Sequence, residues 1–308
     1  MDDDAKFQKR TRGYVIHTQD LRNKHFLFYI SHEGFTPRLL STRIDSTLQH
    51  LVCIDDELFI PLPSKKIVLV IDLVKGEVKE NLFFGEDFYP VDIVQYPDKK
   101  DWYFIASTNS KIAFFNRKKN KAEVQTYSNF INRIDHIVYA NNKIYAASRH
   151  RPYSIMLIVD VPTRALIKEE YLEGGVKELH SGILWVKSIS MDSLPISYTC
   201  NVNDDILQKN VYSYPLRQFA HSPYTQRFYG REFIGFIELY NNKIYVNQIA
   251  LPSNTLVKGF IPDFDESRLV AYSGNRLYYY RDLSSREVQD SLFLDPDLKV
   301  LHGVVHRR

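Results

Sequence analysis

Serine, histidine and cysteine are the side chains that could supply a nucleophile and its base. Ser-His neighbours occur at 31–32, 180–181 and 221–222. Catalysis requires nucleophile, base and orienting group to meet in space, which adjacency in sequence does not provide. There is no Gly-x-Ser-x-Gly motif, and neither Cys53 nor Cys200 stands beside a histidine. The sequence therefore predicts no catalytic residue, and we interpret the Ser-His pairs as turn or surface residues.

Metal ligands are the next chemistry to consider. The ten histidines are scattered, without an H-E-x-x-H motif or cysteine pairs at ligand spacing. His302 and His306 stand four apart in a β-branched, glycine-broken run, which predicts a strand with both on one face. Packed or solvated histidines are favoured there over ligands. Acidic runs at 55–56 and 204–205 lack the spacing of a calcium loop. The sequence predicts no metal and no cofactor.

Composition limits the broad class of protein. A net charge of +3 over 308 residues argues against a nucleic-acid role based on a global positive field. The start, residues 1–6, has no apolar core typical of a signal peptide, and no run reaches the roughly 20 apolar residues of a spanning helix. Cys53 and Cys200 lie in apolar-alternating runs, where buried free thiols are favoured over a disulfide. We expect a cytoplasmic protein without membrane insertion.

A short sequence motif occurs twice and indicates the architecture. Tyr-Ala-Asn-Asn-Lys-Ile-Tyr at 139–145 recurs as Tyr-Asn-Asn-Lys-Ile-Tyr at 240–245, with looser copies at 54–59 and 273–278. Each copy places a polar turn between two apolar runs, which predicts a β-hairpin. An aromatic content of 14% also favours strands. A repeated hairpin indicates an array of similar β units.

The second half of each unit is equally regular. Apolar strands at 67–73, 111–116 and 155–161 each end in a polar turn before an outer strand. The aromatics that follow the hairpin turns recur mostly near the ~40 residues of a four-stranded blade. Counted from Phe28 as the first of these aromatics, we expect the following six at equivalent second-strand positions between blades: Phe59, Phe104, Tyr145, Trp185, Tyr245 and Tyr278.

These units resemble the β-propeller superfamily, in particular irregular seven-bladed, quinoprotein-like, lactonase-like or WD-like propellers. The resemblance covers about residues 13–306, although the Trp-Asp, Asp-box and double-glycine signatures of particular families are absent. It implies an all-β fold of seven four-stranded blades, with six as the alternative. Residues 1–12 would form a charged tail, and 13–308 one propeller domain. We expect the strand at 298–305 to pair with N-terminal residues between 13 and 40 and so close the ring.

One interval is longer than the others, and residues 201–231 are interpreted as an insertion. Aromatic and basic side chains alternate there, the types most enriched at interface hot spots. Plain packing of the loop is an equally weighted alternative, and nucleic-acid or glycan contact a lesser one. The predicted partner-binding residues are Lys209, Tyr214, Arg217, Phe219, Tyr224, Arg227, Tyr229 and Arg231.

The sequence as a whole favours a non-catalytic propeller scaffold that binds an unidentified protein partner. Ala-poor, Tyr-rich usage suits a viral structural or host-recognition component, which would place the protein in a virion. The alternative is a propeller hydrolase or lyase, whose axial site the resemblance to lactonases would build from groups such as Asn109, Asp135, Asn141 and Asn241. A glycan-binding propeller is the second alternative. Basic segments at 6–12 and 306–308 would meet at the ring closure and could bind an acidic partner.

Overall fold

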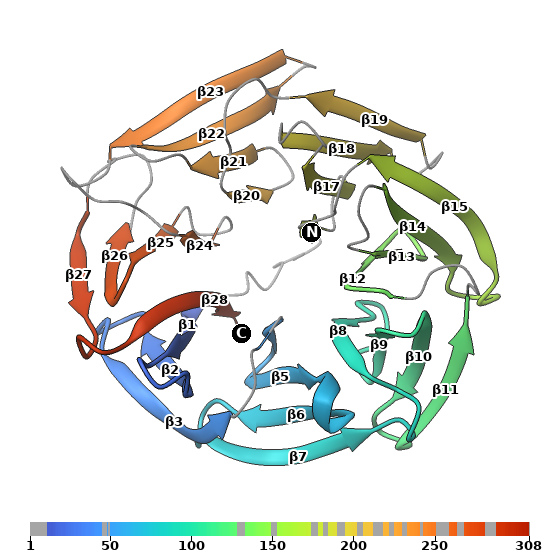
Figure 1. Ribbon diagram of the computed structural model, residues 1–308, viewed down its shortest axis with the longest axis horizontal. Coiled ribbons are helices and arrows are strands. Elements are labelled where there is room, and N and C mark those ends of the chain that lie inside the picture. Colours follow the sequence, from blue (N-terminus) through green and yellow to red (C-terminus); the bar gives the residue numbers. More distant parts are fainter. Residues whose placement is uncertain are drawn as a thin grey trace, which may run out of the picture.

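The structure of the chain is a computed structural model, and it describes residues 11–44, 48, 50–127, 133–148, 153–173, 178–180, 184–189, 195–201, 206–211, 218–221, 225–229, 233–240, 243–250, 259–263, 268–280 and 288–307. Side chains are described for most of 12–173 and for much of 268–306. Within these residues the pairing of strands gives seven four-stranded antiparallel sheets. They stand around a common centre, with β7, β11 and β15 on the perimeter and β8 and β12 toward the middle (Figure 1). The predicted all-β propeller is confirmed.

We number the sheets 1 to 7 in chain order. Sheet 1 contains β28 (Lys299–Arg307), β1 (Thr11–Gln19), β2 (His25–Ser31) and β3 (Pro37–Ile44). Sheet 2 contains β4 (Val52–Ile54), β5 (Glu57–Leu62), β6 (Ile67–Asp72) and β7 (Glu77–Phe83), with the 3-10 helix η1 (Pro63–Lys65) between β5 and β6. Sheet 3 contains β8 (Pro90–Gln95), β9 (Trp102–Ser107), β10 (Lys111–Asn116) and β11 (Lys121–Thr126). Sheet 4 contains β12 (His136–Ala140), β13 (Lys143–Ala147), β14 (Tyr153–Asp160) and β15 (Leu166–Glu173).

The remaining sheets follow the same order. Sheet 5 contains β16 (Glu178–His180), β17 (Leu184–Ile189), β18 (Pro195–Asn201) and β19 (Ile206–Val211). Sheet 6 contains β20 (Gln218–His221), β21 (Thr225–Tyr229), β22 (Phe233–Tyr240) and β23 (Lys243–Ala250). Sheet 7 contains β24 (Gly259–Asp263), β25 (Arg268–Ser273), β26 (Arg276–Tyr280) and β27 (Asp290–Phe293).

The repeated Asn-Asn phrase forms a tight hairpin turn. Ala140 pairs with Lys143, so only Asn141 and Asn142 connect β12 to β13. Both asparagines have positive φ, 47° and 57°, as a type I′ turn requires. Asparagine tolerates this left-handed conformation better than most residues, which explains why the phrase carries it. The prediction of a hairpin at 139–145 is confirmed.

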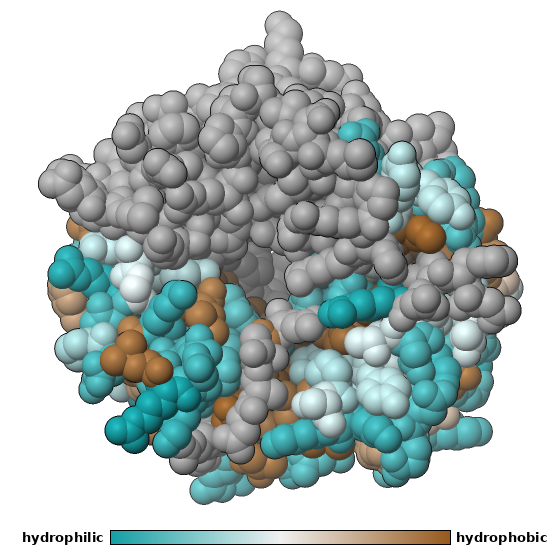
Figure 2. Space-filling view, viewed as in Figure 1, coloured by the Kyte–Doolittle hydropathy of each residue, from teal (hydrophilic) through white to brown (hydrophobic). Residues whose placement is uncertain are grey.

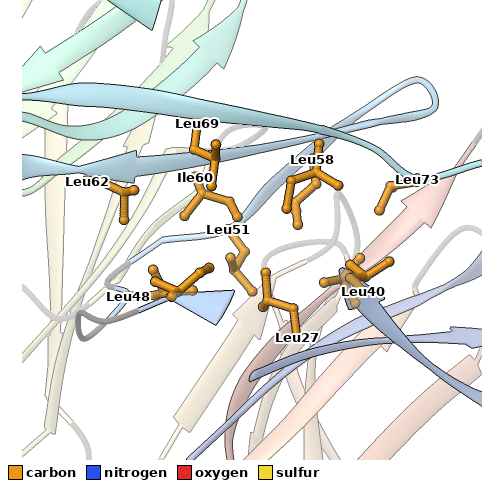
Figure 3. Packing of buried hydrophobic residues seen from close by; sticks show 12 residues of the cluster. Leu27, Leu40, Leu48, Leu51, Leu58, Ile60, Leu62, Leu69 and Leu73 are labelled. Atoms are coloured by element: carbon orange, nitrogen blue, oxygen red, sulfur yellow. The ribbon is translucent and has the colours of Figure 1, made fainter. Parts of the chain in front are cut away.

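The core lies in layers between adjacent sheets. Along β5, Leu58 and Ile60 pack with Leu27 of sheet 1 (Figure 3). The intervening Phe59 packs with Tyr103 and other residues of sheet 3. Successive side chains of a strand point to opposite faces, and here both faces are covered. This explains why the middle strands read as continuous apolar runs without polar alternation.

The ring closes through the C-terminal strand, as predicted. β28 pairs antiparallel with β1 from Thr11↔Arg307 to Gln19↔Lys299, so residues near the two chain ends share sheet 1. Gly303 permits the close approach at this junction, since a Cβ there would lie 2.6 Å from the Val15 carbonyl oxygen. Pairing β28 with β1 covers edges that would otherwise be exposed.

The expected equivalence of the hairpin aromatics is wrong in part. The predicted second-strand position holds for those in β5, β9, β13 and β17, namely Phe59, Phe104, Tyr145 and Trp185. Tyr245 instead lies in β23, the fourth strand of sheet 6, and Tyr278 in β26, the third strand of sheet 7. Phe28 is also in a third strand, because β28 precedes β1 in sheet 1. A blade contains three hairpins, and a turn phrase can serve any of them.

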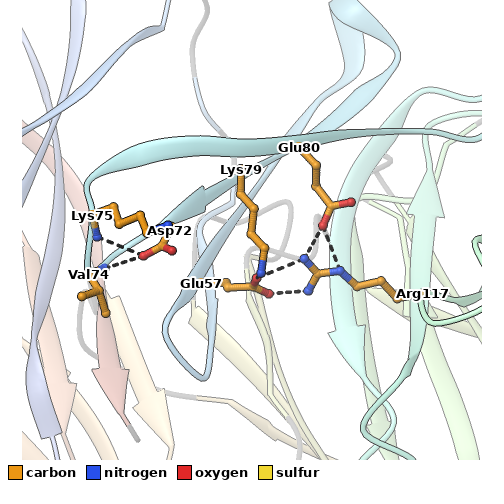
Figure 4. Close-up of polar contacts among 7 residues, drawn as sticks. All are labelled: Glu57, Asp72, Val74, Lys75, Lys79, Glu80 and Arg117. Atoms are coloured by element: carbon orange, nitrogen blue, oxygen red, sulfur yellow. Dashed lines mark hydrogen bonds and ion pairs between the residues drawn. The ribbon is translucent and has the colours of Figure 1, made fainter.

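An ion network links the outer parts of sheets 2 and 3. Arg117, in the turn after β10, binds Glu57 of β5 and Glu80 of β7, and Lys79 also pairs with Glu57 (Figure 4). The Arg117 Nη2–Glu57 Oε1 and Arg117 Nε–Glu80 Oε1 distances are 3.0 and 2.9 Å. The guanidinium also lies 5.4 Å from the ring centre of Phe59. The turn of one sheet is thereby tied to two strands of its neighbour.

Candidate functional site

An open pocket lies between sheets 1 and 2, beside the ring closure. Its volume is about 390 Å³, and it is lined by residues of β1, β2, β3, β28 and the β6–β7 turn. Its apolar wall includes Tyr29, Pro37, Leu73 and Val74. Of these, Val74 is 61% exposed. The pocket therefore offers an apolar surface to a ligand.

Two arginines give the same pocket a positive rim. The Arg38 guanidinium donates to the carbonyl oxygens of Leu73 and Val74 at 2.5 and 3.1 Å and lies 5.5 Å from the ring centre of Tyr29. Arg12 is exposed, and its Nη1 lies 3.8 Å from Asp56 Oδ1. These contacts hold Arg38 in place while leaving Arg12 at the surface. Arginine and tyrosine side by side are typical of interface hot spots.

His306, which is buried, also lines this pocket. Its Nδ1 lies 3.0 Å from the Tyr29 hydroxyl, and its Nε2 lies 3.3 Å from Asp56 Oδ1. Burial lowers the pKa of His306 despite the opposing effect of Asp56, and burial raises the pKa of Tyr29 to about 12. Of the two basic end segments predicted to meet, Arg12 and His306 both line this pocket, and residues 6–10 and 308 lie outside the described residues.

A second group gathers where the inner edges of sheets 2, 3 and 4 approach one another. His50 precedes β4, Asp92 lies in β8, and His136 begins β12. One ligand atom from each lies within 4.8 Å of those of the other two. His50 Nδ1 is 3.8 Å from Asp92 Oδ1, and the two imidazole rings are 4.8 Å apart. We call these three residues the inner-edge triad.

Local backbone geometry orients the Asp92 side chain of the triad. The register of β8 against β9 shifts between Pro90 and Asp92, and such a bulge redirects a side chain. The Asp92 carboxylate then accepts hydrogen bonds from the backbone N–H of Ile93 at 2.9 Å and of Ile137 at 3.0 Å. Asp92 is therefore held between sheets 3 and 4 by main-chain donors.

A chain of imidazoles runs beside the triad through sheet 1. His25 Nδ1 lies 2.9 Å from His17 Nε2, and His17 Nδ1 lies 3.0 Å from His302 Nε2. Burial, helped by its neighbours His302 and His25, lowers the pKa of His17 to about 3. Burial and the nearby His50 likewise lower the pKa of His302 to about 4. These rings are consequently neutral at physiological pH, which lets each donate and accept.

The partner-binding residues predicted from sequence fall where side chains are not described. Lys209 is in β19, Phe219 in β20, and Arg227 and Tyr229 in β21. The other four, Tyr214, Arg217, Tyr224 and Arg231, lie outside the described residues.

The three strands of this stretch pair within sheets 5 and 6. Much of 201–231 therefore contributes to the sheets, and a binding role for its side chains stays a prediction.

Other predicted groups have clear positions. Asn109 and Asn141 lie in turns and are not part of the triad. Asn109 Nδ2 donates a hydrogen bond to Asp87. Asp135 is buried and paired with Arg133 at 2.7 Å. Asn241 lies outside the described residues.

Of the two cysteines, the structure describes the side chain of Cys53 alone. Cys53 is a half-buried free cysteine, and burial raises the pKa of its thiol. The side chain of Cys200, in β18, is not described.

Sequence reasoning missed the triad because it sought ligands at short spacing. His50, Asp92 and His136 stand 42 and 44 residues apart, which is about one blade. Each lies at or near the start of an inner strand, so polar residues recurring at the blade period were the available signal.

The fold and these two sites define a β-propeller with an interblade pocket and a polar inner edge. No protein-family model matches the sequence, and no curated protein does. Among solved structures, hydrazine synthase from Kuenenia stuttgartiensis aligns over 88% of this chain and 99% of its own, with a TM-score of 0.62 and 13% identity. The WD40 domain of coronin from Toxoplasma gondii aligns over 87% and 78%, with a TM-score of 0.65 and 11% identity. At these identities the comparisons establish the propeller fold alone.

Proposed function

We propose that the protein is a propeller scaffold that binds a protein partner through the pocket between sheets 1 and 2. The observation that carries the proposal is the pairing of an open apolar pocket with Arg12, Tyr29 and Arg38 at its rim. A WD40-like propeller fold supports a role in protein interaction. In Figure 2 the hydrophobic groups of the described surface form separate patches on the face shown, so a local pocket suits docking better than a broad apolar face.

The chemistry of the rim selects the kind of partner. Two guanidinium groups beside an apolar wall favour an acidic peptide segment that carries a neighbouring aliphatic or aromatic side chain. Asp56 already lies near Arg12 and His306, so a partner carboxylate would replace or extend an interaction that the free protein makes internally.

The test is a binding experiment on one double variant and a matched control. We would capture partners from the native source with the wild-type protein and measure each captured protein's affinity for Arg12→Ser/Arg38→Gln. Arg22→Ser removes another exposed arginine, in the β1–β2 loop, and serves as the control. We expect the double variant to bind at least ~5-fold more weakly, since a hot-spot truncation costs more than about 1 kcal/mol. A partner that binds all three proteins equally well would refute the pocket as the docking site.

The stretch 201–231 is a second proposed contact surface, supported by its alternating arginines and aromatics. Arg217→Ala, Tyr224→Ala and Arg227→Ala should leave the fold intact and weaken binding of the same partner in at least one case. A loss of stability without a change in binding would favour plain packing.

The proposed location in the cytoplasm or a virion, and a viral structural or host-recognition role, have the support of composition alone. No helix in the described part of the chain has the length and apolar character needed to span a bilayer.

A further inference from the structure

We infer that the inner-edge triad binds one divalent transition-metal ion, with His50, Asp92 and His136 as its protein ligands. The sequence predicted no metal, and the inference comes from the way three sheets bring these residues together. It is independent of the proposed partner binding, because the triad residues are not among those that line the interblade pocket.

The ligand set is the first reason. Two imidazoles and one carboxylate suit Zn²⁺, Fe²⁺, Co²⁺ or Ni²⁺ better than Ca²⁺ or Mg²⁺, which prefer oxygen ligands. Three protein ligands with a remaining position for water are the arrangement of an open zinc site.

The spacing of the atoms is the second reason. Ligands about 2.1 Å from a tetrahedral ion lie ~3.4 Å from each other. His50 Nδ1 and Asp92 Oδ1 are already 3.8 Å apart, and the full triad fits within 4.8 Å. Small side-chain rotations would therefore bring all three atoms to bonding distance around one ion.

An unsatisfied buried atom is the third and independent reason. His50 Nε2 is buried and has no hydrogen-bond partner among the described residues. A buried polar atom without a partner costs about 1–3 kcal/mol, so such atoms in a folded protein call for an explanation. An ion bound through His50 Nε2, after rotation of the ring, would satisfy this atom, whereas an ion bound through Nδ1 would leave it without a partner.

The surroundings fit a metal site in two further respects. The Asp92 carboxylate is oriented by the backbone N–H groups of Ile93 and Ile137, as ligating carboxylates usually are by outer hydrogen bonds. The ligands come from three successive sheets, so a bound ion would join sheets 2, 3 and 4 at their inner edges. Metal binding should therefore stabilise the folded ring, because the ion binds the folded state in preference to the unfolded chain.

The experiment uses Zn²⁺, Co²⁺ and Ca²⁺ alone as probes of the full chain after treatment with a chelator. Zn²⁺ affinity is measured by competition with a chromophoric chelator, stoichiometry by elemental analysis, and coordination from the visible spectrum of Co²⁺. We expect one Zn²⁺ per chain, a Co²⁺ spectrum typical of four or five ligands, a raised melting temperature with Zn²⁺, and little binding of Ca²⁺.

Variants assign the site. His50→Gln and His136→Gln should each lower Zn²⁺ affinity at least ~100-fold, more than the 10–100-fold typical of lost outer partners. His32→Gln removes an imidazole that contacts Tyr279 in sheet 7 and should bind Zn²⁺ like the wild type. Circular dichroism without metal shows whether each variant folds. His50→Gln is the decisive variant because His50 precedes its strand and retains 18% side-chain exposure.

Absence of stoichiometric Zn²⁺ or Co²⁺ binding by the wild-type protein would overturn the proposal. So would Zn²⁺ affinity unchanged in a folded His50→Gln variant, because the ion would then be held elsewhere. Equal affinity for Ca²⁺ and Zn²⁺ would overturn the assignment of imidazole ligands.

Discussion

Arg117 provides the most direct test of how neighbouring blades are joined. Arg117→Met keeps an unbranched side chain over Phe59 but removes the charge that pairs with Glu57 and Glu80. Because Arg117 belongs to sheet 3 and both carboxylates to sheet 2, the variant perturbs a contact between blades. We expect it to lower the free energy of unfolding by about 2 kcal/mol.

The magnitude follows from the exposure of the partners. Opposite charges 4 Å apart attract by about 4 kcal/mol at an effective dielectric constant of about 20, before the cost of desolvation. Exposed pairs yield only 0.2–1 kcal/mol net, whereas removing one partner of a buried pair costs about 3–5 kcal/mol. The side chains of Arg117 and Glu57 are 19% and 15% exposed, between these limits, and Lys79 remains to compensate Glu57 in the variant.

The assay is urea unfolding of Arg117→Met, Glu57→Gln, Glu80→Gln and the two double variants, with Lys118→Ala as the control. Double-mutant cycles then give the coupling of Arg117 to each carboxylate. We expect the larger coupling with Glu57, because its side chain is less exposed than that of Glu80, at 15% against 35%. Lys118 is exposed in the same turn, so its loss should cost less than about 0.5 kcal/mol. A cost for Arg117→Met no larger than that of the control, or zero coupling to both carboxylates, would refute the reasoning.

Two further predictions concern the closing sheet. Deleting residues 298–308 removes β28 and should lower the melting temperature by at least about 10 °C, since β1 loses its partner; an unchanged thermal scan would contradict the closure. Acid should also weaken the fold, because the folded pKa of His17 is about 3 against 6.5 in an unfolded chain. This contribution to stability is complete above about pH 6.5 and declines as the pH falls toward 3, with about 2 kcal/mol lost by pH 5. Urea unfolding from pH 7.5 to 5 in chelator measures the slope, which His17→Gln should reduce; equal slopes would show that His17 is not its source.

The hairpins of this protein, and hence its class of fold, could be predicted from local sequence. Asn141 and Asn142 encode a two-residue turn through their tolerance of positive φ, and alternation between polar turns and apolar strands is a local property. The third strands at 67–72, 111–116 and 153–160 could also be predicted from the sequence, because strands buried on both faces have long apolar runs.

The place of each hairpin within its blade could not be predicted from local sequence. The same phrase joins the first and second strands of sheet 4 at Tyr145 but the third and fourth strands of sheet 6 at Tyr245, since a turn specifies a reversal and not a position. Ring closure by β28 could be anticipated from the need to cover an edge, but its register with β1 could not.

The candidate sites depended on the tertiary structure still more. Arg12 and His306 share a pocket because the first and last strands pair, and His50, Asp92 and His136 meet because three blades turn the same inner edge toward one another. No local spacing encodes such a meeting. The radial repetition of the fold converts residues one blade apart in sequence into neighbours in space, and this is what a search for closely spaced motifs cannot detect.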